Sequence, residues 1–211
     1  MLVAGRVNLE ETLAALAKRR RVFHSERDFQ VALAWQVQIA GPDLNVYLET
    51  RPAEGVHLDL AIESADHEHY TAIELKYFTR RWLGRVGGQL FDLKAHGAHD
   101  LGGWGVVKDV KRVEEFVQSR QGSNGAVIAV TNDPKYWTPT PLSTANDTAF
   151  RLGEGTVLEG LRRWLRPPAD AKNGASFNLE GSYDLRWSDY SRFEPDGHLR
   201  QLVIEIPGPT R

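Results

Sequence analysis

The sequence predicts a single α/β domain in which helices cover both faces of a mixed central sheet. Apolar residues recur at helical spacing near the N-terminus, and three alternating segments typical of strands lie between residues 45 and 77. A nearly continuous apolar segment, 126–131, is typical of a strand buried on both faces. The 211 residues suffice for one well-filled core, and we expect a C-terminal extension of that domain from about residue 134.

Two helices are predicted before the first strand. The segment 8–21 begins at Asn8, a residue that favours helix N-caps, and ends in a basic run suited to a helix C-terminus. The second helix begins at Ser25, with an acidic residue at the third position as in a capping box. The Gly-Pro pair 41–42 ends it.

The remaining elements follow from changes in periodicity and from glycine and proline positions. Alternation predicts three consecutive strands, 45–50, 56–62 and 71–77. Beyond them we expect helices at 89–99, 108–119 and 155–166, the buried strand 126–131, and a hairpin of strands 182–188 and 199–206. For Lys108, Lys111 and Arg112 we favour a solvent-exposed helix face over contact with phosphates.

Composition excludes several classes of protein. The chain has no cysteine, so disulfides and thiolate metal sites are absent. A net charge of -2 argues against an avid, nonspecific nucleic-acid binder, although an enzyme with a local basic face is compatible with it. No segment reaches the length of a membrane span and the N-terminus is a poor signal peptide, so we expect a soluble cytoplasmic protein with no membrane partner.

Strand parity brings three charged residues to one side of the predicted sheet. In 56–62 the apolar residues at even positions, Leu58 among them, share one face, and Asp59 points to the other. In the next strand Glu74 and Lys76 point together away from the apolar face. If these strands are neighbours, an aspartate, a glutamate and a lysine meet.

Two carboxylates held close together repel each other, and a divalent cation relieves that repulsion. Hard oxygen ligands suit Mg²⁺ or Mn²⁺, and Mg²⁺ leaves coordination positions for water and a substrate phosphate. A lysine beside the metal could orient the attacking water or stabilise developing charge. The backbone carbonyl of Leu75, between Glu74 and Lys76, is a further candidate ligand.

Asp59, followed fifteen positions later by Glu-Leu-Lys at 74–76, resembles the PD-(D/E)XK nuclease superfamily, which has the restriction-endonuclease-like fold. The resemblance covers residues 25–131, and Leu58 stands where the family pattern has proline. It implies that Asp59 and Glu74 bind the metal and that Lys76 assists the attacking water.

The same resemblance assigns two further residues. Glu26, on the upstream helix, matches an additional acidic ligand, and Gln89, at the start of the predicted helix after the Glu-x-Lys strand, matches an accessory catalytic residue. We also expect residues 81–88 to form a mobile loop beside the site. The nearby basic residues that could contact nucleic acid there are Arg80, Arg81 and Arg85.

The implied function is Mg²⁺- or Mn²⁺-dependent hydrolysis of phosphodiester bonds in nucleic acid, with DNA favoured, and a homodimer is left open. One alternative is a noncatalytic module with the nuclease fold that binds nucleic acid or a protein partner. Another is an unrelated α/β protein whose Glu-x-Lys pair is a surface ion pair.

Overall fold

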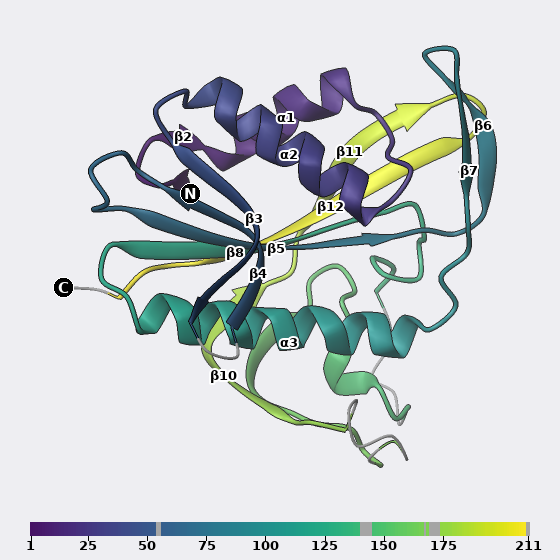
Figure 1. Cartoon of the computed structure of the whole chain (residues 1–211). Coiled ribbons are helices and arrows are strands. Elements are labelled where there is room, and N and C mark those ends of the chain that lie inside the picture. The colour runs from purple at the N-terminus through teal and green to yellow at the C-terminus, as the bar shows by residue number, and fades with distance from the viewer. Residues whose placement is uncertain (54–55, 140–144, 167, 169–173, 210–211) are drawn as a thin grey trace.

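The computed structural model describes residues 1–53, 56–139, 145–166, 168 and 174–209. Its centre is a six-stranded mixed sheet with the strand order β11-β12-β8-β5-β4-β3 (Figure 1). Only β5 and β8 run parallel to each other, and every other neighbouring pair is antiparallel. The strands are β3 (Asn45–Ala53), β4 (Val56–Glu63), β5 (Tyr70–Phe78), β8 (Ser123–Thr131), β11 (Trp187–Phe193) and β12 (Gly197–Ile206).

Helices cover both faces of this sheet, as the sequence predicted. α1 (Leu9–Arg19) and α2 (Glu26–Ala40) lie on one face, and α3 (His99–Gln118) lies on the other (Figure 1). The side chains of Asn8 and Ser25 cap α1 and α2 by accepting hydrogen bonds from backbone N–H groups three residues later, at 3.1 and 3.2 Å. Both predicted N-caps are therefore confirmed, and α2 ends before Gly41 as expected.

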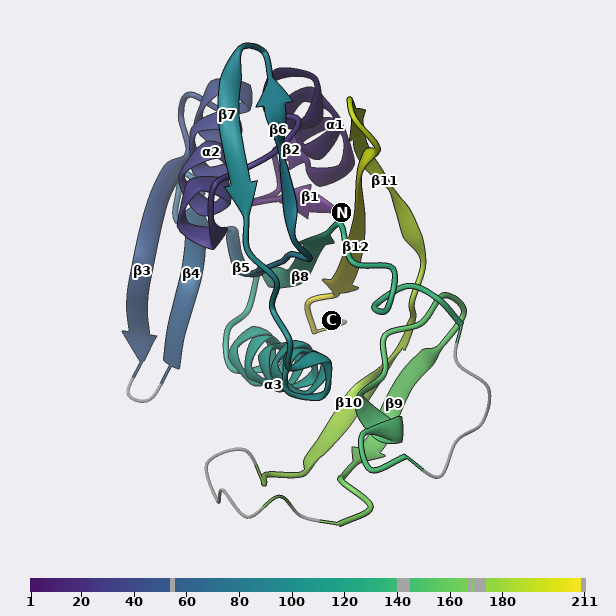
Figure 2. The ribbon, with the colours of Figure 1, turned by 90° about the vertical axis from the view of Figure 1, so that its right-hand side faces the viewer.

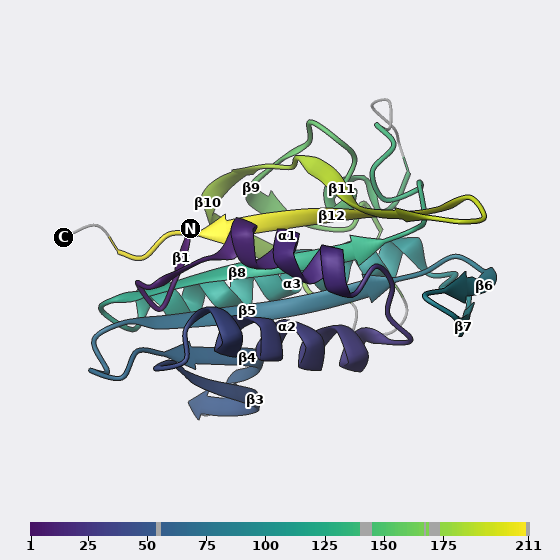
Figure 3. The same ribbon diagram turned by 90° about the horizontal axis from the view of Figure 1, so that it is seen from above.

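The segment after β5 differs from the prediction. Residues 82–93 form a hairpin of β6 (Trp82–Val86) and β7 (Gln89–Leu93) beyond the carboxyl end of β5 (Figures 1 and 3). The predicted helix 89–99 and the predicted loop 81–88 are therefore wrong. Phe91 and Leu93 are buried two positions apart, which is the period of a strand, and the two turn glycines at 87–88 both have positive φ.

A single long helix then connects the two parallel strands. α3 begins at His99, nine residues before the predicted start, and its C-terminal half contains the predicted helix 108–119 almost entirely. It packs on β5 and β8 as the crossover that two parallel strands require. α3 is consequently the helix that faces the Glu-x-Lys residues of β5.

The C-terminal third contributes to the sheet and to a separate hairpin. β9 (Val157–Arg162) pairs with β10 (Phe177–Asp184) on the α3 side of the molecule (Figure 2), so the predicted helix 155–166 is wrong. The predicted strand 182–188 spans the β10–β11 junction, and β12 pairs with β11 and β8. Short elements complete the chain: β1 (Leu2–Val3), β2 (Val7–Asn8) and the 3₁₀ turn η1 (Thr148–Phe150).

The sheet separates two apolar clusters, one under α1 and α2 and one against α3. Leu60 and Ile62 pack in the first cluster, whereas Leu58 and Ala61 pack in the second. The expectation that Leu58 shares a face with Leu60 is therefore wrong, because the alternation of β4 breaks at Asp59. No helix in the described part of the chain is long and apolar enough to cross a membrane.

Candidate functional site

The ladder between β4 and β5 ends in the middle of β5. The strands pair from Glu63 opposite Tyr70 as far as Leu60 opposite Ile73. Beyond this point β3 and β4 turn away from the other strands (Figure 1). Hence the next outward-pointing N–H groups of β5 lack a partner strand.

Two predicted acidic residues occupy the place of that strand. Asp59 Oδ2 accepts a hydrogen bond from Leu75 N at 2.7 Å, and Glu26 Oε2 accepts one from Tyr77 N at 2.9 Å. Glu26 is the first residue of α2, so the capped start of that helix delivers its carboxylate to β5. Gln30, one turn later on α2, donates to the backbone oxygen of Asp59 at 2.7 Å and fixes β4 beside it.

Glu74 and Lys76 share one face of β5, as strand parity predicted, and both contact α3. Lys76 Nζ lies 2.5 Å from Asp109 Oδ2 and donates a hydrogen bond to the Leu75 carbonyl at 3.0 Å. Glu74 Oε1 lies 2.6 Å from Arg112 Nη1. The same Nη1 lies 3.4 Å from Asp109 Oδ1, so the two ion pairs form one network.

Asp109 and Arg112 are the site residues that the sequence analysis missed. The expected solvent-exposed position is wrong for Arg112, which pairs with buried Glu74, and Asp109 is itself only 3% exposed. A signal was present: Asp109 lies beside Val110 and three residues after Val106, within the apolar stripe that α3 buries. An acidic residue inside such a stripe indicates a buried cationic partner.

The electrostatics of the cluster reflect an excess of carboxylates. Burial, together with the charges of Asp109 and Asp59, raises the pKa of Glu74 to about 8, although Arg112 opposes this rise. Burial also raises the pKa of Glu26. Burial alone would lower the pKa of Lys76, but the neighbouring carboxylates, Asp109 foremost, raise it. The ammonium of Lys76 is therefore held in its charged form.

The donor atoms suit a hard cation, but the arrangement does not form a complete metal centre. Glu26 and Asp59 each use one carboxylate oxygen for a β5 N–H, and the described residues provide no hydrogen bond or ion pair to the other oxygen. Glu74 is engaged by Arg112, and the Leu75 carbonyl accepts from Lys76. Across the described residues, no group of three or more His, Cys, Asp or Glu side chains is placed to hold a metal ion.

The other predicted site residues lie outside this network. Gln89 begins β7 rather than a helix, and its Nε2 lies 2.8 Å from His24 Nε2, so the expected position at a helix start is wrong. Arg80, Arg81 and Arg85 are exposed. Arg85 lies in β6 and donates to the Gly88 carbonyl at 2.8 Å, which places it in an ordered hairpin rather than in the predicted mobile loop.

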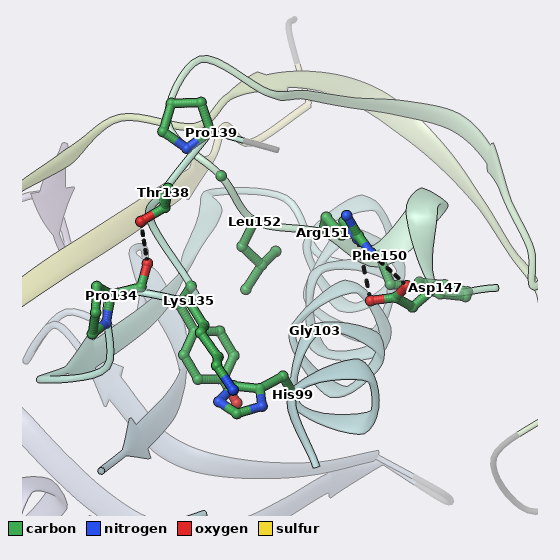
Figure 4. A pocket seen from close by; sticks show the side chains of 12 residues that line it. His99, Gly103, Pro134, Lys135, Thr138, Pro139, Asp147, Phe150, Arg151 and Leu152 are labelled. Carbon is green, nitrogen blue, oxygen red and sulfur yellow. Dashed lines mark hydrogen bonds and ion pairs between the residues drawn. The ribbon is translucent and has the colours of Figure 1, made fainter. Parts of the chain in front are cut away.

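One cavity lies apart from the carboxylate cluster. It has a volume of about 460 Å³ and lies at the N-terminal end of α3 (Figure 4). His99, which contributes to its wall, pairs with Asp133 at 2.7 Å, and Arg151 pairs with Asp147 at 3.2 Å. None of the acidic residues of the cluster lines this cavity.

Comparison with known proteins adds no relative: no family model, no curated protein and no solved structure matches this chain.

Proposed function

We propose that this protein is a metal-dependent nuclease of the PD-(D/E)XK type that hydrolyses phosphodiester bonds in nucleic acid, with DNA favoured. One observation carries the proposal. Where β4 leaves β5, Asp59 and Glu26 are fixed by backbone N–H groups on either side of Lys76, and Glu74 lies on the same strand. A metal-dependent phosphodiesterase needs this combination of acidic ligands with a cation beside them.

Charge balance supports a divalent cation. The four carboxylates and two cations of the cluster interact with one another and, when all are ionised, leave an excess of two negative charges. One Mg²⁺ or Mn²⁺ ion would neutralise that excess, whereas a proton on Glu74, whose pKa burial and then the neighbouring carboxylates raise to about 8, would offset only one of the two charges. The members of the cluster are Glu26, Asp59, Glu74, Lys76, Asp109 and Arg112.

Each residue then has a defined task. Glu26, Asp59, Glu74 and the Leu75 carbonyl would hold the ion. When bound, such a metal supplies a water of lowered pKa and neutralises charge on the scissile phosphate. Lys76 holds its positive charge beside these ligands, where it stabilises the negative charge that develops during cleavage. The exposed arginines at and after the end of β5 would contact flanking phosphates.

A specific observation favours the alternative, a noncatalytic module with the same architecture. Glu74 and Lys76 both have partners on α3, at 2.6 and 2.5 Å, so each charge is already satisfied within the protein. Such a module would bind nucleic acid or a protein partner, and its buried charges would serve the fold. The two candidates differ in metal binding.

Cleavage and metal binding distinguish them. Plasmid and single-stranded DNA are incubated with the purified protein in Mg²⁺, Mn²⁺ or EDTA, beside Lys76→Ala and a control, Lys94→Ala, whose side chain is exposed. The nuclease proposal expects metal-dependent cutting that Lys76→Ala abolishes and Lys94→Ala retains. Failure to cut either DNA, together with no heat of Mg²⁺ binding in calorimetry, would favour the noncatalytic module. Metal-dependent cutting that persists in Lys76→Ala would contradict the role assigned to Lys76.

A further inference from the structure

Asp109 is a buried charge that contributes to the charge balance of the cluster but is neither a proposed metal ligand nor a proposed phosphate contact. It projects from the middle of α3 and is only 3% exposed. Removing a carboxylate from water is strongly unfavourable unless cations compensate it. Its two oxygens meet two different cations, Lys76 at 2.5 Å and Arg112 at 3.4 Å.

The contact with Asp109 restrains the side chain of Lys76. A lysine ammonium has three N–H donors on a flexible four-carbon stem, so its direction is set by its partners. Two partners hold the ammonium of Lys76: the Asp109 carboxylate and the carbonyl of Leu75, at 3.0 Å. The described residues provide no third hydrogen-bond acceptor or ion-pair partner. The hydrogen bond to Leu75 and the ion pair with Asp109 together fix the position of the ammonium.

The neighbouring backbone leaves room for this arrangement. Gly105, one turn before Asp109 on α3, faces the lysine stem, and a Cβ atom built on Gly105 would lie 3.8 Å from Lys76 Cε. α3 therefore passes directly beside the side chain that its aspartate binds. Arg112, one turn later, bridges Asp109 and Glu74, so the aspartate is itself held in place.

We propose that Asp109 is the positioning residue for Lys76: it holds the lysine ammonium against the Leu75 carbonyl and directs the remaining N–H toward the reacting phosphate. This inference rests on the proposed nuclease function and deepens it. Asp109 acts through Lys76 and touches neither substrate nor metal. α3 thus takes part in catalysis although it contributes no metal ligand.

The test compares Asp109→Asn and Asp109→Glu with Glu115→Gln, a control on the same helix whose side chain is 65% exposed. Asp109→Asn keeps the shape and removes the charge, and Asp109→Glu restores a carboxylate one methylene further out. We expect Asp109→Asn to lower kcat for plasmid cleavage roughly 10- to 100-fold, the range for residues that orient a site's primary groups, with KM within about twofold. Asp109→Glu should recover part of the loss.

A second readout does not require activity. In ¹⁵N NMR spectra of the metal-free protein, an ammonium held by two acceptors should exchange slowly with water and give a separate signal, assigned by its absence in Lys76→Arg. The wild-type signal should be present, and Asp109→Asn should lose it. If the ammonium protons of wild-type Lys76 exchange with water as fast as those of exposed Lys94, the proposal is overturned. This result needs only the wild-type protein, so the test still works if the Asp109 variants fail to fold.

The outcomes separate the two proposals. A wild-type protein that cuts no substrate refutes the nuclease function, and the positioning role falls with it. Active wild-type protein with unchanged kcat in folded Asp109→Asn refutes the positioning role alone. A loss of kcat that Asp109→Glu does not relieve, with the Lys76 signal retained in Asp109→Asn, would show that Asp109 supports only the fold.

Discussion

Replacing Glu74 by glutamine should make stability less sensitive to alkaline pH. The Glu74 side chain is 2% exposed, and its pKa is raised from 4.5 to about 8, chiefly by burial and then by Asp109 and Asp59. The folded state therefore binds the Glu74 proton more tightly than the unfolded chain. That contribution to the free energy of unfolding is fully present below pH 4.5 and is lost as pH rises through 8.

Glutamine resembles the protonated carboxyl group and cannot ionise, so Glu74→Gln escapes this loss. The free energy of unfolding of the variant, relative to wild type, should increase by about 1.4 kcal/mol per pH unit within that window. Between about pH 5.5 and pH 8 the relative gain amounts to roughly 3 kcal/mol.

Urea unfolding in EDTA, followed by tryptophan fluorescence at both pH values, measures this difference. Glu115→Gln on the exposed face of α3 is the control and should stay within about 0.5 kcal/mol of wild type. If Glu74→Gln changes the free energy of unfolding by the same amount at both pH values, the reasoning is refuted. The carboxyl group of Glu74 would then titrate alike in the folded and unfolded states. Adding Mg²⁺ at the higher pH should stabilise wild type more than Glu74→Gln if Glu74 is a ligand.

Three further variants test the helices that position the site. Ser25→Ala removes the α2 cap and should lower the free energy of unfolding by about 1 kcal/mol in the same urea assay, and an unchanged midpoint would contradict a role for the cap. Gly103→Ala should lower the Tm clearly in thermal unfolding, because its Cβ would lie 2.2 Å from the Phe150 backbone oxygen. Gly105→Ala, whose added Cβ atom would lie 3.8 Å from the side-chain Cε of Lys76, should be neutral or stabilising by up to about 1 kcal/mol. Equal changes of stability in the two glycine variants would show that the contact with the Phe150 backbone oxygen does not destabilise Gly103→Ala.

Much of the fold could be predicted because its signals are local. Helix caps involve residues three positions apart, and both Asn8 and Ser25 act as predicted. Strand parity involves residues two positions apart, so Glu74 and Lys76 share a face as expected. The apolar segment 126–131 is part of β8, a strand buried on both faces.

The rest depends on contacts between distant residues. The hairpin 82–93 packs Phe91 and Leu93 on the core of α1 and α2, and that tertiary burial outweighs the weak helical pattern of the same segment. The position of Asp59 results from a break in the alternation of β4 at the end of the strand ladder. Such a break cannot be predicted from the alternation of apolar and polar residues alone. Asp109 and Arg112 join the site only because α3 crosses over β5.

The early end of the β4–β5 ladder also bears on which site residues would be retained if selection for activity were lost. Asp59 and Glu26 accept hydrogen bonds from two strand N–H groups that would otherwise be buried without a partner, so the fold itself selects for both carboxylates. Lys76 satisfies no backbone donor, but it compensates the buried carboxylate of Asp109, so the fold also favours a cation at this position. In a lineage released from catalysis, we therefore expect both the acidic pair and Lys76 to persist. Retention of these residues would then be poor evidence of activity in divergent copies.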